Sequence, residues 1–185
     1  KYSKVPKTLP VVLTKKEIVK LIDSIENKKH KLMIKLIYSA GLRVSELVNL
    51  KVNNLEFENN YGFVRKGKGN KDRLFIIAKS LKEDLLNYIK ENKLTEESWL
   101  FRSYKGHISV RTVQVIVKRA AKKANISKNI SCHTLRHSFA THLIENGNSV
   151  SDVQTLLGHK SPETTFTYLH NSVEKMINIK SPLDD

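Results

Sequence analysis

Side chains that could do chemistry are concentrated in the second half of this sequence. His133 and Arg136 are three positions apart, His159 ends the run Leu157-Gly158-His159, and Tyr168 follows nine positions later. Such a set is compatible with three kinds of site: a metal site, a site with a nucleophilic Cys or Ser, and a phosphate site built on Arg, His and Tyr.

The first two kinds of site lack residues that they require. His133 and His137 would share one face of a helix, but no adjacent Glu completes a metalloprotease motif and the chain has a single cysteine. Cys132 and His133 are direct neighbours, whose side chains point apart on a helix, so they do not form a nucleophile and base pair. We expect Cys132 to be a small buried side chain, and we predict no metal ion and no other cofactor.

A phosphate site uses these residue types together. Arginine guanidinium groups bind the non-bridging oxygens of a phosphodiester in a bidentate manner. Tyrosine, with an ordinary pKa of about 10, is a better leaving group than an alkoxide, so a sugar hydroxyl can reverse a phosphotyrosine link. Such a reaction keeps the energy of the broken bond and needs no ATP.

The overall charge indicates a polyanionic partner. Lys and Arg number 33 against 18 Asp and Glu, a formal net charge of +15, which favours nucleic acid. No long apolar run and no basic amphipathic helix supports a membrane as the alternative. One cysteine excludes an intramolecular disulfide, and with no signal peptide or lipidation motif we predict a cytoplasmic protein.

Hydrophobic periodicity predicts a mainly α domain with one small antiparallel β-sheet, an α+β fold. Thr14 and Glu17 form a capping box that opens the first helix. Ser109, Ser149 and Ser161 are further predicted N-caps. After the first helix, the predicted helices cover 31–39, a stretch from about 43, 80–91, 109–124, 134–145, 149–157, 162–168 and 173–179. A hairpin is predicted within 55–78, with its turn at 67–70.

The motifs and their order resemble those of the tyrosine recombinases, and Xer-type recombinases within that family. The segment from Gly41 through Arg43 to Glu46 resembles the family's first arginine box, and GKGNKDR at 67–73 resembles its hairpin lysine. SCHTLRHSFATHLIENG and LLGHKSPETTFTYLH resemble the carboxyl-terminal boxes.

The resemblance implies a role for each matched residue. Arg43 and Arg136 would clamp the scissile phosphate, and Tyr168 would attack it, leaving a 3′-phosphotyrosine and a free 5′ hydroxyl. Lys68 would protonate the leaving 5′ oxygen, with Lys66 and Lys71 as competitors for that role. His133 would accept the tyrosine proton or orient the phosphate, and His159 would bind a non-bridging oxygen. Glu46 would brace the first arginine or, alternatively, lie on a solvated helix face.

Basic side chains near these boxes are predicted phosphate contacts, namely Lys66, Lys71, Arg73, Arg102, Arg111, Lys118 and Arg119. One face of the predicted 109–124 helix carries Arg111 and Lys118 and suits the major groove. Its apolar side, with Val113, Ile116 and Val117, belongs to the core.

Three parts are predicted along the chain. Residues 1–13 read as a basic linker from an N-terminal core-binding domain that precedes this chain, 14–170 as the catalytic domain, and 171–185 as a tail with a short helix. By resemblance, this tail either docks on its own domain or passes to a neighbouring subunit, joining four protomers on two DNA sites. We thus expect a site-specific recombinase acting on duplex DNA. The rivals are a type IB topoisomerase, a catalytically silent DNA-binding module and a metal-dependent nuclease, the last opposed by the lack of clustered Asp and Glu.

Overall fold

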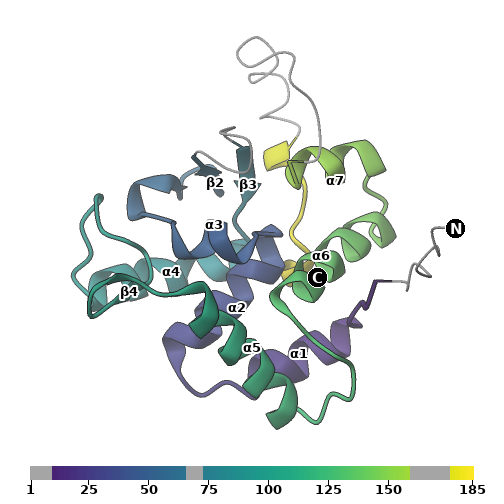
Figure 1. The fold of residues 1–185 in the computed structure, drawn as a ribbon. Helices are drawn as coiled ribbons and strands as arrows, with labels where there is room; N and C mark the ends of the chain where they lie inside the picture. Colours follow the sequence, from purple (N-terminus) through teal and green to yellow (C-terminus); the bar gives the residue numbers. More distant parts are fainter. Residues whose placement is uncertain (1–9, 66–72, 159–175) are drawn as a thin grey trace, which may run out of the picture.

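A computed structural model describes residues 10–65, 73–158 and 176–185 of the chain. This part is mostly helical with two small antiparallel sheets, which confirms the predicted fold class (Figure 1). The helices are α1 (Lys15–Asp23), α2 (Lys28–Ala40), α3 (Val44–Val48), α4 (Lys79–Glu91), α5 (Val110–Lys123), α6 (Cys132–Glu145) and α7 (Val150–Leu156), with short 3-10 helices η1 (Val52–Asn54) and η2 (Pro182–Asp184). The strands are β1 (Leu55–Glu56), β2 (Tyr61–Val64), β3 (Arg73–Ile76), β4 (Arg102–Ser103) and β5 (Gly106–His107).

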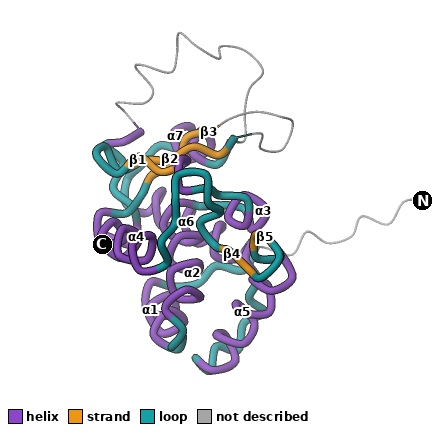
Figure 2. Tube along the Cα trace, turned by 90° about the vertical axis from the view of Figure 1, so that its left-hand side faces the viewer, coloured by secondary structure: helices purple, strands orange, loops and turns teal. Residues whose placement is uncertain are grey.

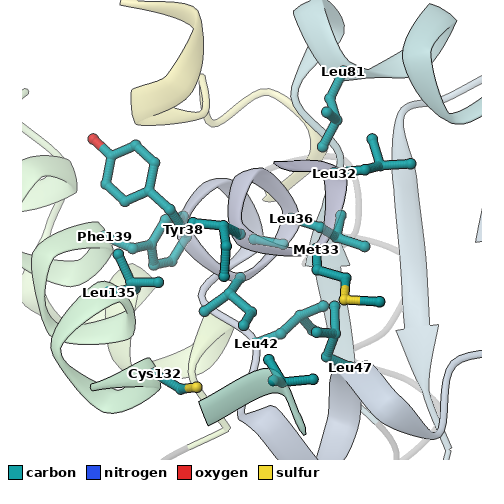
Figure 3. Packing of buried hydrophobic residues seen from close by; sticks show 14 of the residues in the cluster. Leu32, Met33, Leu36, Tyr38, Leu42, Leu47, Leu81, Cys132, Leu135 and Phe139 are labelled. Atoms are coloured by element: carbon teal, nitrogen blue, oxygen red, sulfur yellow. The ribbon is translucent and has the colours of Figure 1, made fainter. Parts of the chain in front are cut away.

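Helix α2 is the centre of the core. It packs against α1, α3, α4, α5, α6, β3 and η2, and its buried residues run without a break from Leu36 to Ala40. Figure 3 shows Leu135 and Phe139 of α6 on one side of α2 and Leu81 of α4 on another. A helix buried on most of its surface is stabilised by tertiary packing more than by the helix propensity of its residues. The carboxyl end of α2 therefore has a well-defined position, from which the next residues start.

Local caps set where several helices begin. The predicted capping box at Thr14 and Glu17 is present, and Ser109 and Ser149 cap α5 and α7 as predicted. Two starts were predicted too late, because Asn27 caps α2 and Ser131 caps α6 with their side chains. The earlier start of α6 places His133 in its first turn.

The larger sheet has the order β1-β2-β3, with β2 and β3 antiparallel and Val64 opposite Arg73. The predicted hairpin is therefore confirmed in its strands, while its turn lies outside the described residues. Helix α7 packs against β3, and Figures 1 and 2 both place this sheet and α7 at one end of the molecule. The two-residue ladder of β4 and β5 was not predicted.

The end of the chain packs on its own domain. Ser181 donates a hydrogen bond from Oγ to the carbonyl of Ser39 at 2.8 Å, and Pro182 is buried. The carboxylate of Asp184 accepts from the backbone N–H groups of Lys79 and Ser80, at 2.8 and 3.0 Å, at a helix start that has no cap from Ala78. In this structure residues 181–184 dock on their own domain. Of the predicted helix over 173–179, residues 176 and 177 are helical, and 173–175 lie outside the described residues.

Candidate active site

Arg43 is the N-cap residue of α3 and directly follows the turn that ends the central helix. Gly41 has φ +59°, and a Cβ at this position would lie 2.4 Å from the Phe139 ring, so the turn requires glycine. Glu46, one helical turn after Arg43, accepts from the Arg43 backbone N–H at 2.7 Å and from its Nη1 at 2.8 Å. The Glu46 side chain is only 4% exposed, against 26% for Arg43. This burial excludes the solvated-face alternative for Glu46 and matches the expected brace.

Arg136 lies on α6 with its side chain 4% exposed. Its Nη1 donates to the carbonyl of Gly41 and its Nη2 to that of Leu157 at 2.6 Å. Nη1 also lies 3.8 Å from Glu46 Oε2. The same carboxylate thus faces Arg43 and Arg136, so two arginines more than ninety positions apart converge on one point.

Arg73 does not fit the predicted phosphate contact. Its side chain, at the start of β3, is 8% exposed and makes a forked interaction with Glu46, Nε to Oε1 at 3.1 Å and Nη2 to Oε2 at 2.5 Å. Its Nη1 donates to the carbonyl of Leu156 at 2.5 Å and its Nη2 to that of Gly41 at 3.4 Å. All three guanidinium nitrogens are engaged by protein acceptors, because the arginine points into the fold rather than into solvent.

The charges of this cluster do not balance. Burial raises the pKa of Glu46, but the hydrogen bonds and charge of Arg73 and the hydrogen bonds from Arg43 outweigh it and hold the pKa below its ordinary value. Burial lowers the pKa of the Arg136 guanidinium, and the charges of Arg73 and Arg43 lower it further, against the opposing effect of Glu46. Three guanidinium groups around one carboxylate leave excess positive charge, which a bound anion would relieve.

A pocket of about 620 Å³ opens in front of Arg43 and Arg136. His133, Arg111 and Lys118 also line it, so five of the predicted site residues share one cavity. The His133 ring lies edge-on to that of His137, with centroids 4.4 Å apart. The apolar residues Val113, Ile116 and Val117 of α5 are buried as predicted, which turns Arg111 and Lys118 towards this pocket.

Arg43 also lines a second pocket, of about 910 Å³, beside the larger sheet. Lys51 and Arg65 line it, and the Lys51 ammonium lies 5.3 Å from the centre of the Trp99 ring. Neither cation was predicted as a site residue. Arg65 could have been predicted as a DNA contact, because it lies close to the predicted hairpin turn in the sequence. Lys51 lies in none of the motifs, and only the fold brings it beside Arg43.

The remaining predicted site residues lie elsewhere. Arg102 and Arg119 are exposed but line neither pocket, and Arg102 donates from Nη2 to the carbonyl of Asn92 at 2.8 Å. Cys132 is buried, as expected. Five predicted residues fall outside the described part of the chain: Lys66, Lys68, Lys71, His159 and Tyr168.

Two kinds of feature are absent from the described residues. Within 10–65, 73–158 and 176–185, no group of three or more His, Cys, Asp or Glu side chains could hold a metal ion. Among the helices of the same residues, none combines the length and the apolar character needed to cross a membrane.

Comparison with known proteins gives consistent matches. The sequence model of the phage integrase family matches residues 11–175. Tyrosine recombinase XerA of Pyrococcus horikoshii is 42% identical over 172 residues, which cover 91% of this chain and 59% of that protein. The chain thus spans about three fifths of the length of this curated relative.

Solved structures match in the same way. The crystal structure of XerA recombinase aligns with a TM-score of 0.76 and 31% identity, covering 92% of this chain and 65% of that one. The XerH site-specific recombinase, solved bound to its difH substrate in a pre-cleavage complex, aligns with a TM-score of 0.71 and 28% identity, covering 86% of this chain and 51% of that one.

Proposed function

The chain belongs to the phage integrase family, the family of the tyrosine recombinases, and from this premise we propose that it cuts and rejoins duplex DNA in site-specific recombination. The observation that carries the proposal is the buried carboxylate of Glu46 among Arg43, Arg73 and Arg136, with two of these arginines facing a pocket that other cations also line. A fixed cluster with excess positive charge is suited to stabilise the charge that builds on a phosphate in the transition state.

The reaction is a transesterification. The Tyr168 oxygen attacks the scissile phosphorus, its proton passes to a base, and the bond from phosphorus to the 5′ oxygen breaks. Arg43 and Arg136 neutralise the non-bridging oxygens, and His133, which lines the same pocket, takes the tyrosine proton or orients the phosphate. We assign the protonation of the leaving 5′ oxygen to Lys68 and a contact with a non-bridging oxygen to His159. The reverse reaction, with a 5′ hydroxyl of another strand, rejoins the DNA without a cofactor.

Cations that line the two pockets would position the duplex. Arg111 and Lys118 line the first pocket, and Lys51 and Arg65 the second, so phosphates on either side of the scissile one would meet basic side chains. We propose that the protein acts in the cytoplasm as a tetramer on two DNA sites, as strand exchange between two duplexes requires, and that residues 14–170 carry the chemistry.

The test uses supercoiled plasmids that carry genomic fragments of the source organism, because the target sequence is unknown. The chain and its Tyr168→Phe variant are incubated with this library in the presence of a chelator, quenched with detergent, and assayed for DNA covalently attached to protein. Tyr104→Phe, which alters a fully exposed tyrosine, is the matched control. We expect an adduct from the parent and from the control but none from Tyr168→Phe.

Three other outcomes would overturn the proposal. An adduct from Tyr168→Phe as well would remove Tyr168 as the nucleophile. DNA binding without any adduct would favour a silent binding module. Relaxation of the plasmid without exchange between two copies of the recovered site would favour a topoisomerase.

A further inference from the structure

Arg73 is a buried arginine whose hydrogen-bond partners all belong to the candidate site or border it. It is the residue through which two separate segments meet, one with the carbonyl of Gly41 and the carboxylate of Glu46, the other with the carbonyl of Leu156. These segments lie in the first arginine box and at the end of α7, directly before Gly158 and His159 in the sequence. We assign no phosphate role to Arg73, because all three of its guanidinium nitrogens bind protein acceptors and it lines neither pocket, whereas Arg136 lines the first.

The contact with Glu46 controls Arg43. Arg73 occupies both Glu46 oxygens, through Nε and Nη2, while Arg43 donates to the same two oxygens from its backbone N–H and its Nη1. The plane of the carboxylate is therefore fixed by the Arg73 fork, and the position of Arg43 Nη1 follows from that plane. The Arg43 side chain is more exposed than that of Arg73, so its position depends more on the contact with Glu46 than on packing.

The contact with α7 fixes the chain before His159. Arg73 and Arg136 bind the successive carbonyls of Leu156 and Leu157, where cations favourably oppose the helix dipole. Gly158, with φ +69°, packs against the Arg73 side chain so closely that a Cβ would lie 2.9 Å from Arg73 Cδ. The direction in which the chain leaves α7 is thus shaped by Arg73.

We propose that Arg73 is a positioning residue for the DNA cleavage step, acting through Glu46 on the phosphate clamp of Arg43 and through Leu156 on the end of α7. This inference rests on the proposed function. Lysine at this position would keep the positive charge but could not form the fork or reach Glu46 and Leu156 together. Arg73→Lys therefore separates the geometry of the contact from its charge.

The experiment measures single-turnover adduct formation on a duplex oligonucleotide containing the site recovered from the plasmid library. Two versions of the substrate are compared, one with the ordinary scissile phosphate and one with a methylphosphonate, in which a methyl group replaces a charged non-bridging oxygen. On the phosphodiester we expect Arg73→Lys to slow adduct formation by roughly 10- to 100-fold, by analogy with the loss of a residue that orients a metal ligand. On the neutral methylphosphonate the demand on the arginine clamp is smaller, so the ratio of parent to variant rates should move towards one.

A residue that only supports the fold would slow both substrates equally, and that result would overturn the proposal, as would a variant as fast as the parent on the phosphodiester. Lys35→Arg, the converse exchange in the surface ion pair with Asp84, is the control and should leave both rates unchanged. If Arg73→Lys does not unfold cooperatively, Arg73→Gln, which also removes the fork to Glu46 and Leu156, is measured instead and should give the same substrate dependence. Failure of the parent to form any adduct would instead refute the proposed function.

Discussion

Replacing Glu46 by glutamine removes the one carboxylate among three arginines while keeping the shape of the side chain. Breaking a buried ion pair by removing one partner costs about 3 to 5 kcal/mol, because the remaining charge stays buried and unpaired. Glu46 and Arg73 are buried, whereas Arg43 is partly exposed and can turn towards water. The amide oxygen of glutamine can still accept one hydrogen bond from Arg73. We therefore expect the lower end of that range, about 3 kcal/mol.

Urea unfolding at pH 7 measures this loss as a lower midpoint with an unchanged slope. For a chain of this size, about 3 kcal/mol corresponds to a fall in Tm of roughly 6 to 12 °C. Glu97→Gln is the matched control, because Glu97 pairs with Lys51 at 3.1 Å but its side chain is 76% exposed. A surface pair contributes at most about 1 kcal/mol, so the control should be nearly as stable as the parent.

The pH dependence of the difference in unfolding free energy between the parent and Glu46→Gln tests whether the charge of Glu46 causes it. Since the pKa of Glu46 is lower in the folded chain than in the unfolded one, its stabilisation is fully present above the unfolded pKa of about 4.3. It is lost as the pH falls through the folded pKa. The gap in unfolding free energy between parent and Glu46→Gln should therefore narrow below about pH 4. A gap that stays constant on acidification, or a variant as stable as the parent at pH 7, would refute the argument.

Two further predictions concern the docked tail and the DNA surface. Asp184→Ala removes the carboxylate that caps α4. In thermal unfolding this variant should lose about 0.5 to 2 kcal/mol of unfolding free energy. The control, Glu83→Ala on the exposed side of α4, should not lose this amount. Lys118→Ala removes a cation that lines the first pocket and should reduce the slope of log affinity for duplex DNA against log salt by about 1, in fluorescence anisotropy titrations. Lys20→Ala on α1 is the control, and an equal slope change for both variants would contradict the assigned surface.

Local signals in the sequence were enough for most of the helices and for the hairpin strands. Thr14 and Glu17 specify the start of α1 through contacts three residues apart, and the buried side of α5 follows from its own spacing. The pairing of β4 with β5 was missed because two residues a strand are too short to show an alternation. Boundaries were wrong where the cap was an unrecognised side chain, as with Ser131.

The site was predicted less completely, for a different physical reason. The order of the motifs indicated Arg43, Arg136 and His133, which the structure brings to one pocket. Arg73 was interpreted as a phosphate contact because it is a basic residue near the motif boxes, yet its partners Glu46 and Leu156 are 27 and 83 positions away. Whether a charged side chain is buried depends on such distant acceptors, and no local pattern records them. The alternatives for Glu46 stayed open in the sequence for the same reason.

The turn at Gly41 shows why stability and chemistry are coupled in this molecule. Its carbonyl accepts from both Arg73 and Arg136, and it follows directly on α2, the most buried helix of the core. The packing of the core therefore fixes the Gly41 carbonyl, and this carbonyl, together with the Glu46 carboxylate, holds the arginine side chains in place. Substitutions in this cluster should alter unfolding free energy and cleavage rate together, so a slow variant alone does not identify a catalytic residue. Comparison of a charged with a neutral scissile phosphate separates the two effects, because the groups that bind the phosphate oxygens respond to the charge of the substrate and the stability of the fold does not.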